Sequence, residues 1–161
     1  MQLSFDRSQL TSFLHRSHMP HAFGTAEVTT GTDQAHVITY RDGDWFMHDR
    51  FFGGEPYGGS QVIFLNDRPI WILNYYGRVI APEFNPRDVY TFLREALRVP
   101  SADEPYRGPR EYRSGEFLYK NQVDGDIEEF RGKETILFQN REIYYAHYVG
   151  GLVDQRAQGE M

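Results

Sequence analysis

The chain has 161 residues and a net charge of −6, with 17 basic residues against 23 acidic ones. One domain of ordinary globular composition is expected at this length. The acidic balance, without a cluster of Lys and Arg, disfavours direct binding of nucleic acid. The absence of cysteine excludes disulfides, thiolate nucleophiles and Cys-based zinc sites. No apolar run has the length of a signal peptide or a membrane-spanning helix, so a cytoplasmic protein without membrane contact is expected.

The first predicted element is a helix over about residues 7–17. Asp6 is placed to cap it and Gln9 to return the hydrogen bond of a capping box. Met19-Pro20 is expected to end it, because proline lacks the backbone donor of a helix interior. Residues 22–34 are rich in Gly and Thr without clear periodicity, so at most one short strand is expected there.

Two hairpins are predicted next. Residues 37–51 are expected to form two strands around Asp42-Gly43, since Asp-Gly between alternating runs favours a hairpin turn. The glycine-rich stretch 51–60 is not expected to be regular throughout. The central hairpin is predicted over residues 61–75, with its turn at Asn66-Asp67.

A second helix is predicted over about residues 86–98. Asn85 is a favourable cap and Pro86 a favourable first helical residue. Val99-Pro100 is expected to end it, and residues 101–109 to form an extended linker. Its apolar residues recur at helical spacing and form one face: Val89, Phe92, Leu93, Ala96 and Leu97.

The remaining chain repeats the strand pattern of the first half. A turn is predicted at Ser114-Gly115, followed by a strand through Asn121 and a corner at Gly125-Asp126. A last hairpin is predicted over residues 135–148, with its turn at Gln139-Asn140. The polar tail, residues 154–161, is expected to be flexible.

An internal repeat connects the two halves. Tyr57 to Gly77, YGGSQVIFLNDRPIWILNYYG, aligns without a gap with Phe130 to Gly150, FRGKETILFQNREIYYAHYVG. Upstream, YRDGDWFMHD (40–49) matches YRSGEFLYKN (112–121), with one residue of slack between the two blocks. Two copies are too few for a solenoid. The pattern therefore predicts a single domain over residues 1–161, with a first repeat at about 37–80 and a second at about 110–153.

The predicted fold class is α+β. The order of elements is helix, strands, helix, strands, and the strands are joined by short turns typical of antiparallel pairs. We expect an internally duplicated antiparallel sheet whose two units share or pair their strands. The two main helices are expected to pack on one face of it.

Strand alternation gives the main hypothesis for a site. It places Asn74 on one face with Ile70 and Tyr76, and His147 at the matching position of the second copy with Ile143. Apolar walls with a few convergent polar groups are typical of a small-ligand pocket. The alternative is that the two polar side chains only satisfy buried groups. The candidate ligand-binding residues are Trp71, Asn74, Tyr75, Tyr76, Tyr144 and Tyr148.

Catalytic and metal-binding patterns are weak. His147 as a general base with Glu134 as a partner is the candidate catalytic pair, and Glu55 is a second carboxylate. His15 and His18 have helical spacing suited to a metal, but His21 lies beyond a proline and no carboxylate is in register. No metal or other cofactor is therefore expected. The sequence contains no nucleophile elbow, His-Glu-x-x-His or dinucleotide fingerprint, which disfavours an enzyme.

The run PIWILNYYG, residues 69–77, resembles the W-x-x-N-Y-Y-G motif of an uncharacterised bacterial family, a domain of unknown function. The resemblance extends from Tyr40 to Leu152. Val149 stands where the family has the His of a Tyr-His-Gly-Gly end motif. The resemblance implies no established activity. Some members are attached to helix-turn-helix regulators of the lambda-repressor type, which implies a sensor or interaction module, and this chain is expected to be the stand-alone form. Its further motifs are Phe52-Gly53-Gly54, Tyr106-Arg107-Gly108-Pro109, Gly125-Asp126, Phe130, Gly132, Glu134, and Tyr148 with Gly150-Gly151.

The sequence therefore predicts a non-enzymatic module that senses a small ligand or contacts a protein partner, with a homodimer through a sheet edge as a further expectation. Aromatic side chains would supply contact area, while Asn74 and His147 would orient the ligand. Two alternatives remain open at this point. One is a small cofactor-independent hydrolase or isomerase using His147 with a carboxylate. The other is an inhibitory or structural partner-binding protein.

Overall fold

The computed structural model describes residues 5–23, 27–99, 101 and 106–156, and side chains within all of these except 19–23 and 27. The described residues form one antiparallel sheet of nine strands and two helices, so the α+β class is confirmed. The elements are α1 (Arg7–Phe23), β1 (Glu27–Thr30), β2 (His36–Asp42), β3 (Trp45–Gly53), β4 (Tyr57–Leu65), β5 (Arg68–Val79), α2 (Pro86–Leu97), β6 (Glu111–Ser114), β7 (Phe117–Asp126), β8 (Glu129–Phe138) and β9 (Arg141–Leu152).

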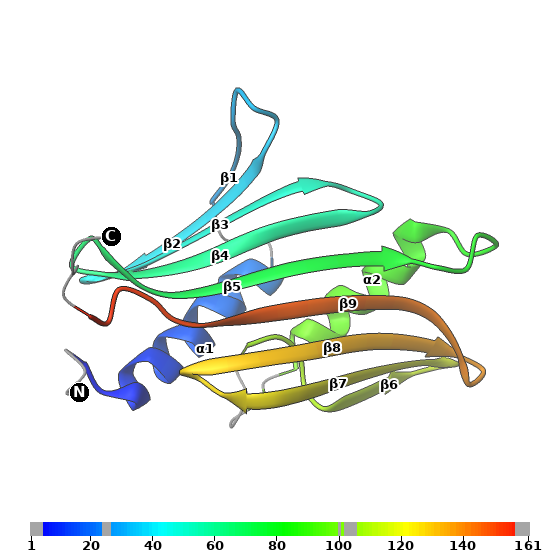
Figure 1. Cartoon of the computed structure of the whole chain (residues 1–161). Coiled ribbons are helices and arrows are strands. Elements are labelled where there is room, and N and C mark those ends of the chain that lie inside the picture. The colour runs from blue at the N-terminus through cyan, green and yellow to red at the C-terminus, as the bar shows by residue number, and fades with distance from the viewer. Residues whose placement is uncertain (1–4, 24–26, 100, 102–105, 157–161) are drawn as a thin grey trace.

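The strand order is β1-β2-β3-β4-β5-β9-β8-β7-β6 (Figure 1). β5 and β9 lie side by side at the centre and pair antiparallel, from Trp71 opposite Leu152 to Val79 opposite Tyr144. Each is the last strand of its half of the chain. The two halves therefore meet through backbone hydrogen bonds between residues far apart in sequence.

The β4–β5 hairpin and the β8–β9 hairpin each contain a β-bulge, and the two bulges lie at positions that align with each other in the repeat. The register shifts after Ile63 in the β4–β5 pair and after Ile136 in the β8–β9 pair. The bulge adds one residue to one strand and so interrupts the alternation of side chains. Ile70 and Ile143 are consequently buried, at 2% and 0% exposure, and do not share the face predicted for them.

Both helices lie on one side of the sheet, behind it in Figure 1. From α1, Leu10, Phe13 and Leu14 are buried against the first half of the sheet, and the Phe13 ring stacks on Trp45 at 5.4 Å. From α2, the apolar face that includes Val89 is buried against the second half. Full burial of one such side chain stabilises the fold by about 1.5–3 kcal/mol. We call this side of the sheet the covered face and the opposite side the open face.

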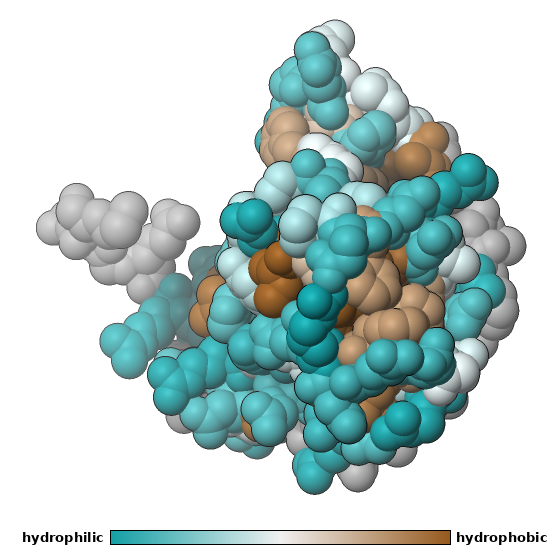
Figure 2. All heavy atoms as spheres, turned by 90° about the vertical axis from the view of Figure 1, so that its right-hand side faces the viewer, coloured by the Kyte–Doolittle hydropathy of each residue, from teal (hydrophilic) through white to brown (hydrophobic). Residues whose placement is uncertain are grey.

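At the end of the sheet where β8 turns into β9, an aromatic cluster closes the core under α2. Phe84, from the loop before α2, contacts Phe138 at 5.0 Å and Phe117 at 6.4 Å between ring centroids. Figure 2 looks onto this end and shows apolar atoms in its middle with a hydrophilic rim. The start of α2 is fixed beside it, because the Asn85 side chain accepts a hydrogen bond from the Arg87 backbone at 3.0 Å.

The predicted end of α1 was wrong. α1 continues through Pro20 to Phe23, because proline removes one helical hydrogen bond but its fixed φ is compatible with helical backbone. The stretch 51–60 is interrupted as expected, since β3 ends at Gly53, β4 begins at Tyr57 and residues 54–56 lie outside both strands. Pro100, at the predicted helix end, residues 102–105 of the predicted linker and residues 157–161 of the tail lie outside the described residues.

Candidate functional site

The two faces of the sheet divide the residues predicted to form one site. Residues opposite each other on β5 and β9 point to the same face, so Tyr75 lies opposite Tyr148 on the covered face and Tyr76 opposite His147 on the open face. Trp71 is also on the covered face, where its indole donates to the Ile127 carbonyl at 2.9 Å. The covered-face residues are Trp71, Tyr75, Tyr144 and Tyr148, none more than 9% exposed, and the open-face residues are Asn74, Tyr76 and His147.

A buried ion pair on the covered face accounts for Glu134. Its carboxylate is 0% exposed and accepts from Arg107, whose Nη2 lies 2.7 Å away. The Tyr119 hydroxyl donates to the second carboxylate oxygen at 2.5 Å. Burial alone would lower the pKa of Arg107, but the charge of Glu134 and nearby tyrosine hydroxyls raise it well above its usual range. Glu134 thus fixes the segment before β6 to the sheet.

Glu134 cannot serve His147 as a catalytic partner. In the β8–β9 register Glu134 lies opposite Ala146, while His147 lies opposite Lys133. Successive residues of a strand point to opposite faces. The two side chains are therefore separated by the thickness of the sheet. Glu55 is also engaged elsewhere, since its carboxylate accepts from the Val79 backbone at 2.9 Å and from the Tyr90 hydroxyl.

Two aligned tyrosines make matching contacts on the covered face. Tyr75 donates to Asp49 and Tyr148 donates to Asn121, each at 2.6 Å. Sequence reasoning missed Asp49 and Asn121 as their partners. The repeat contained the signal, because its upstream block already aligns Asp49 with Asn121. These contacts make both tyrosines part of the buried scaffold.

The covered face leaves only a small cavity near this network, of about 40 Å³. Asp49, Gln61, Tyr75 and Arg107 contribute polar atoms to its lining. The space admits one or a few water molecules. It is far below the roughly 300–1,000 Å³ typical of small-molecule sites.

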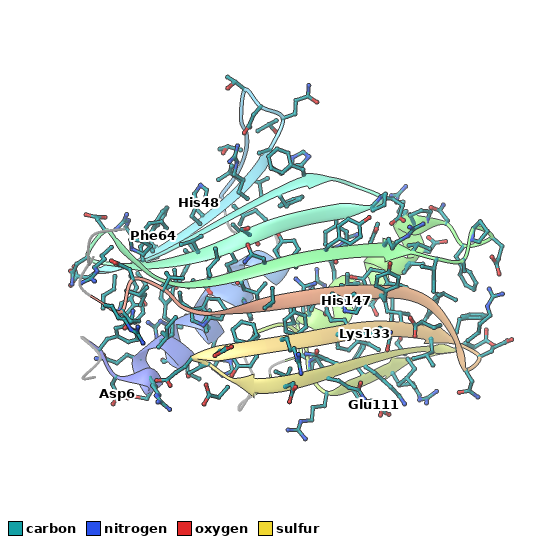
Figure 3. The ribbon with its side chains drawn as sticks, in the orientation of Figure 1. Asp6, His48, Phe64, Glu111, Lys133 and His147 are labelled. Carbon is teal, nitrogen blue, oxygen red and sulfur yellow. The ribbon has the colours of Figure 1, made fainter. Side chains whose placement is uncertain are left out.

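A larger groove of about 690 Å³ lies on the open face at the contact between the two halves. In Figure 3, which looks onto this face, the labelled His147 and Lys133 lie on neighbouring strands. Half-exposed Tyr76 and Val149 (48% and 55% exposed) add apolar surface beside them. The groove is also lined by Asn74, Gln122, Asp124 and Arg131. The groove has the size of a small-molecule site and contains three predicted site residues of the open face, Asn74, Tyr76 and His147.

The strand registers define a line of side chains through this groove. Starting from the groove, Tyr76 lies opposite His147, His147 opposite Lys133, and Lys133 opposite Gln122. In the other direction Tyr76 lies opposite Gly58, and Gly58 opposite Phe52. We call these six residues the central row: Phe52, Gly58, Tyr76, His147, Lys133 and Gln122.

The central row lies in a basic region of an acidic protein. The rows on either side of it add four basic side chains, Arg50, Arg78, Lys120 and Arg131, and two acidic side chains, Asp124 and Glu111, the latter opposite Lys120 on β6. With Lys133 the three rows hold five basic residues and two acidic residues. Three of the five form exposed ion pairs: Arg50 with Asp33, Arg131 with Asp124 at 3.0 Å, and Lys133 with Glu142 at 3.4 Å. Exposed ion pairs of this kind contribute little to stability, so these basic side chains can exchange one anionic partner for another.

The described part of the chain contains no group of three or more His, Cys, Asp or Glu that could hold a metal ion, and the side chain of His21 lies outside it. No described helix is long and apolar enough to cross a membrane.

The fold and the groove define an α+β domain built on one broad antiparallel sheet with a covered face and an open face. The chain belongs to the family described as Domain of unknown function (DUF5680), whose model matches residues 49–153. The match contains the whole central row and the buried ion pair. No curated protein and no solved structure matches the chain.

Proposed function

We propose that this domain is a non-enzymatic binding module and that the central row on the open face is its binding site. The single observation that carries the proposal is the position of exposed Tyr76, His147 and Lys133 side by side on three neighbouring strands. Exposed aromatic area beside a few polar groups is typical of recognition sites. Of the residues predicted for the site, the proposal keeps Asn74, Tyr76 and His147.

The buried aromatic residues have a different role in this proposal. Trp71, Tyr75, Tyr144 and Tyr148 form the scaffold that holds β5 against β9. Acid–base catalysis needs both groups within hydrogen-bond reach of one substrate. Because His147 and Glu134 face opposite sides, the geometry favours binding over hydrolysis or isomerisation.

We extend the proposal to the origin and context of the domain. The matching bulges and the matching Tyr75 and Tyr148 contacts support an internal duplication. The proposal also includes a bacterial origin and a cytoplasmic location. It further includes a sensor role for the domain, which in some relatives is attached to a helix-turn-helix regulator. A homodimer through a sheet edge, at β1 or β6, would leave the open face free. An inhibitory partner-binding role would use the same exposed aromatic side chains.

A thermal-shift screen tests the position of the site. The wild-type protein, Tyr76→Ala and His147→Ala would be screened against a library of metabolites and nucleotides. Both positions are exposed, so the variants should melt within about 2 °C of the wild type. A ligand at a hundred times its Kd stabilises the native state by about 2.7 kcal/mol, which corresponds to roughly 5–10 °C at this chain length.

The expected result is a shift in the wild type that both variants lose. Val28→Ala is the matched control, because Val28 is an equally exposed apolar residue on β1, outside the central row. Ligands whose shifts survive both Tyr76→Ala and His147→Ala would show that the site lies elsewhere.

A further inference from the structure

We propose that the open face binds single-stranded nucleic acid, with bases stacked at Phe52 and Tyr76 and phosphates held by Arg78, Arg131 and Lys133. This inference rests on the proposed binding function and names the chemistry of the ligand. Proteins that bind single strands without strong sequence preference combine exposed aromatic side chains with a positively charged surface. The three rows around the groove supply both.

The aromatic part of the argument is a slot across β4. Phe52 and Tyr76 are 45% and 48% exposed and stand on strands two positions apart, with Gly58 between them. Phe52 on β3 and Tyr76 on β5 are two strand spacings apart, or about 10 Å. Gly58 has no side chain to fill that interval, and a Cβ added there would lie 3.4 Å from Tyr76 Cδ2. The Arg50 guanidinium lies over the Phe52 ring, 5.1 Å from its centroid, and the Tyr76 ring borders Gly58, so a planar base would enter between this cation–aromatic pair and Tyr76.

The charge argument follows from strand alternation. Net charge averages over the whole chain, so its value of −6 led to the expectation of no direct nucleic-acid binding. The sheet instead gathers basic residues on one face, with five basic side chains against two acidic ones, Asp124 and Glu111, in three adjacent rows. A second copy of the chain is a poor occupant, because two such faces would repel each other. An anionic ligand is favoured.

The length of the site favours a strand over a single nucleotide. From Phe52 on β3 to Gln122 on β7 the central row crosses five strand spacings, or about 24 Å. This is enough for a short run of nucleotides, at the lower end of the roughly 4–16 that single-strand-binding folds contact. An acidic peptide would satisfy the cations but would leave the slot beside Gly58 without a planar partner.

Fluorescence anisotropy with labelled twelve-nucleotide oligo-dT and oligo-U tests the inference on the full chain. Saturable binding is expected at about 50 mM salt. If three phosphates are neutralised, the affinity should fall roughly 20-fold between about 50 and 200 mM salt. Labelled mononucleotides should bind much more weakly than the oligonucleotides.

Two variants test the slot and one tests the charge. Tyr76→Ala should weaken binding by about 5- to 150-fold, the range for loss of one stacked base. Gly58→Val should weaken binding while leaving both aromatic residues in place, because valine fills the slot and suits a strand. Lys133→Glu should weaken binding and flatten the salt dependence. Arg94→Glu makes the same charge change on α2, behind the sheet, and should have little effect.

The outcomes separate this inference from the proposed function. Absence of oligonucleotide binding up to about 100 µM protein, with thermal-shift ligands that still depend on Tyr76, would overturn the inference alone. Displacement of the oligonucleotides by an acidic peptide at equal concentration would also overturn the inference alone. If Tyr76→Ala and Gly58→Val change no binding of any kind, both proposals fail. Equal losses in Arg94→Glu and Lys133→Glu would show general charge attraction, which also overturns the inference.

Discussion

Removal of Arg107 should be among the most damaging single substitutions in this domain. Arg107→Met keeps much of the aliphatic length but deletes the charge opposite Glu134. The Glu134 carboxylate is 0% exposed, and the Arg107 side chain is 13% exposed. Breaking a buried ion pair from one side leaves an uncompensated charge and costs about 3–5 kcal/mol. The total free energy of unfolding of such a domain is about 5–15 kcal/mol, so this loss is a large fraction of it.

Urea unfolding followed by tryptophan fluorescence measures this loss. Trp71 is fully buried, so its emission reports the integrity of the core. With a denaturant slope of about 2 kcal/mol per molar urea, the midpoint should fall by roughly 1.5–2.5 M. An unchanged slope would show that the change lies in the stability of the native state.

The double variant Arg107→Met with Glu134→Gln is the control. Glutamine can still accept the hydrogen bond from Tyr119, and no charge remains buried. Most of the lost stability should return, since replacing both partners of a buried pair is often close to neutral. A fall of less than about 0.5 M in the single variant, or a double variant no more stable than the single one, would refute the buried ion pair.

Two further predictions concern the covered face. Gly132→Ala should cost about 1–3 kcal/mol in urea unfolding, because its Cβ would overlap the Tyr148 ring, whereas Gly58→Ala, with room at 3.4 Å, should be close to neutral. Similar losses of stability in both variants would show that the cost comes from replacing a glycine in a strand and not from overlap with the Tyr148 ring. Burial raises the pKa of Tyr119 and Tyr144, so the fold favours their neutral hydroxyls. That stability is complete below about pH 10 and is lost as the pH rises further, so tyrosinate absorbance should increase together with loss of secondary structure. Full ionisation of all tyrosines in a still folded protein would contradict this.

Local features of the fold were predictable because they depend on neighbouring residues. The hairpin turns at Asn66-Asp67 and Gln139-Asn140 follow from residues that tolerate positive φ, and all four adopt it. The start of α2 follows from Asn85 and Pro86. Alternation also assigned Asn74, Tyr76 and His147 correctly to one face.

The composition of the candidate site was less predictable. Pairing Asn74 with His147 in an apolar layer required a guess about which side of the sheet the helices cover, and His147 is instead exposed on the open face. The bulges at Ile70 and Ile143 interrupted the alternation on which that interpretation depended. The pairing of Arg107 with Glu134 could not be predicted from a local pattern, because the two residues are 27 positions apart in sequence.

By itself the sequence determined the type of most strands and helices and the turns between them, because these follow from periods of 2 and 3.6 residues and from local turn chemistry. Only the tertiary structure decided that β5 pairs with β9, that both helices cover the same face, and that Phe52, Tyr76, His147 and Lys133 lie in one row. The physical reason is that pairing between distant strands depends on the packing of the whole core, which no local period encodes.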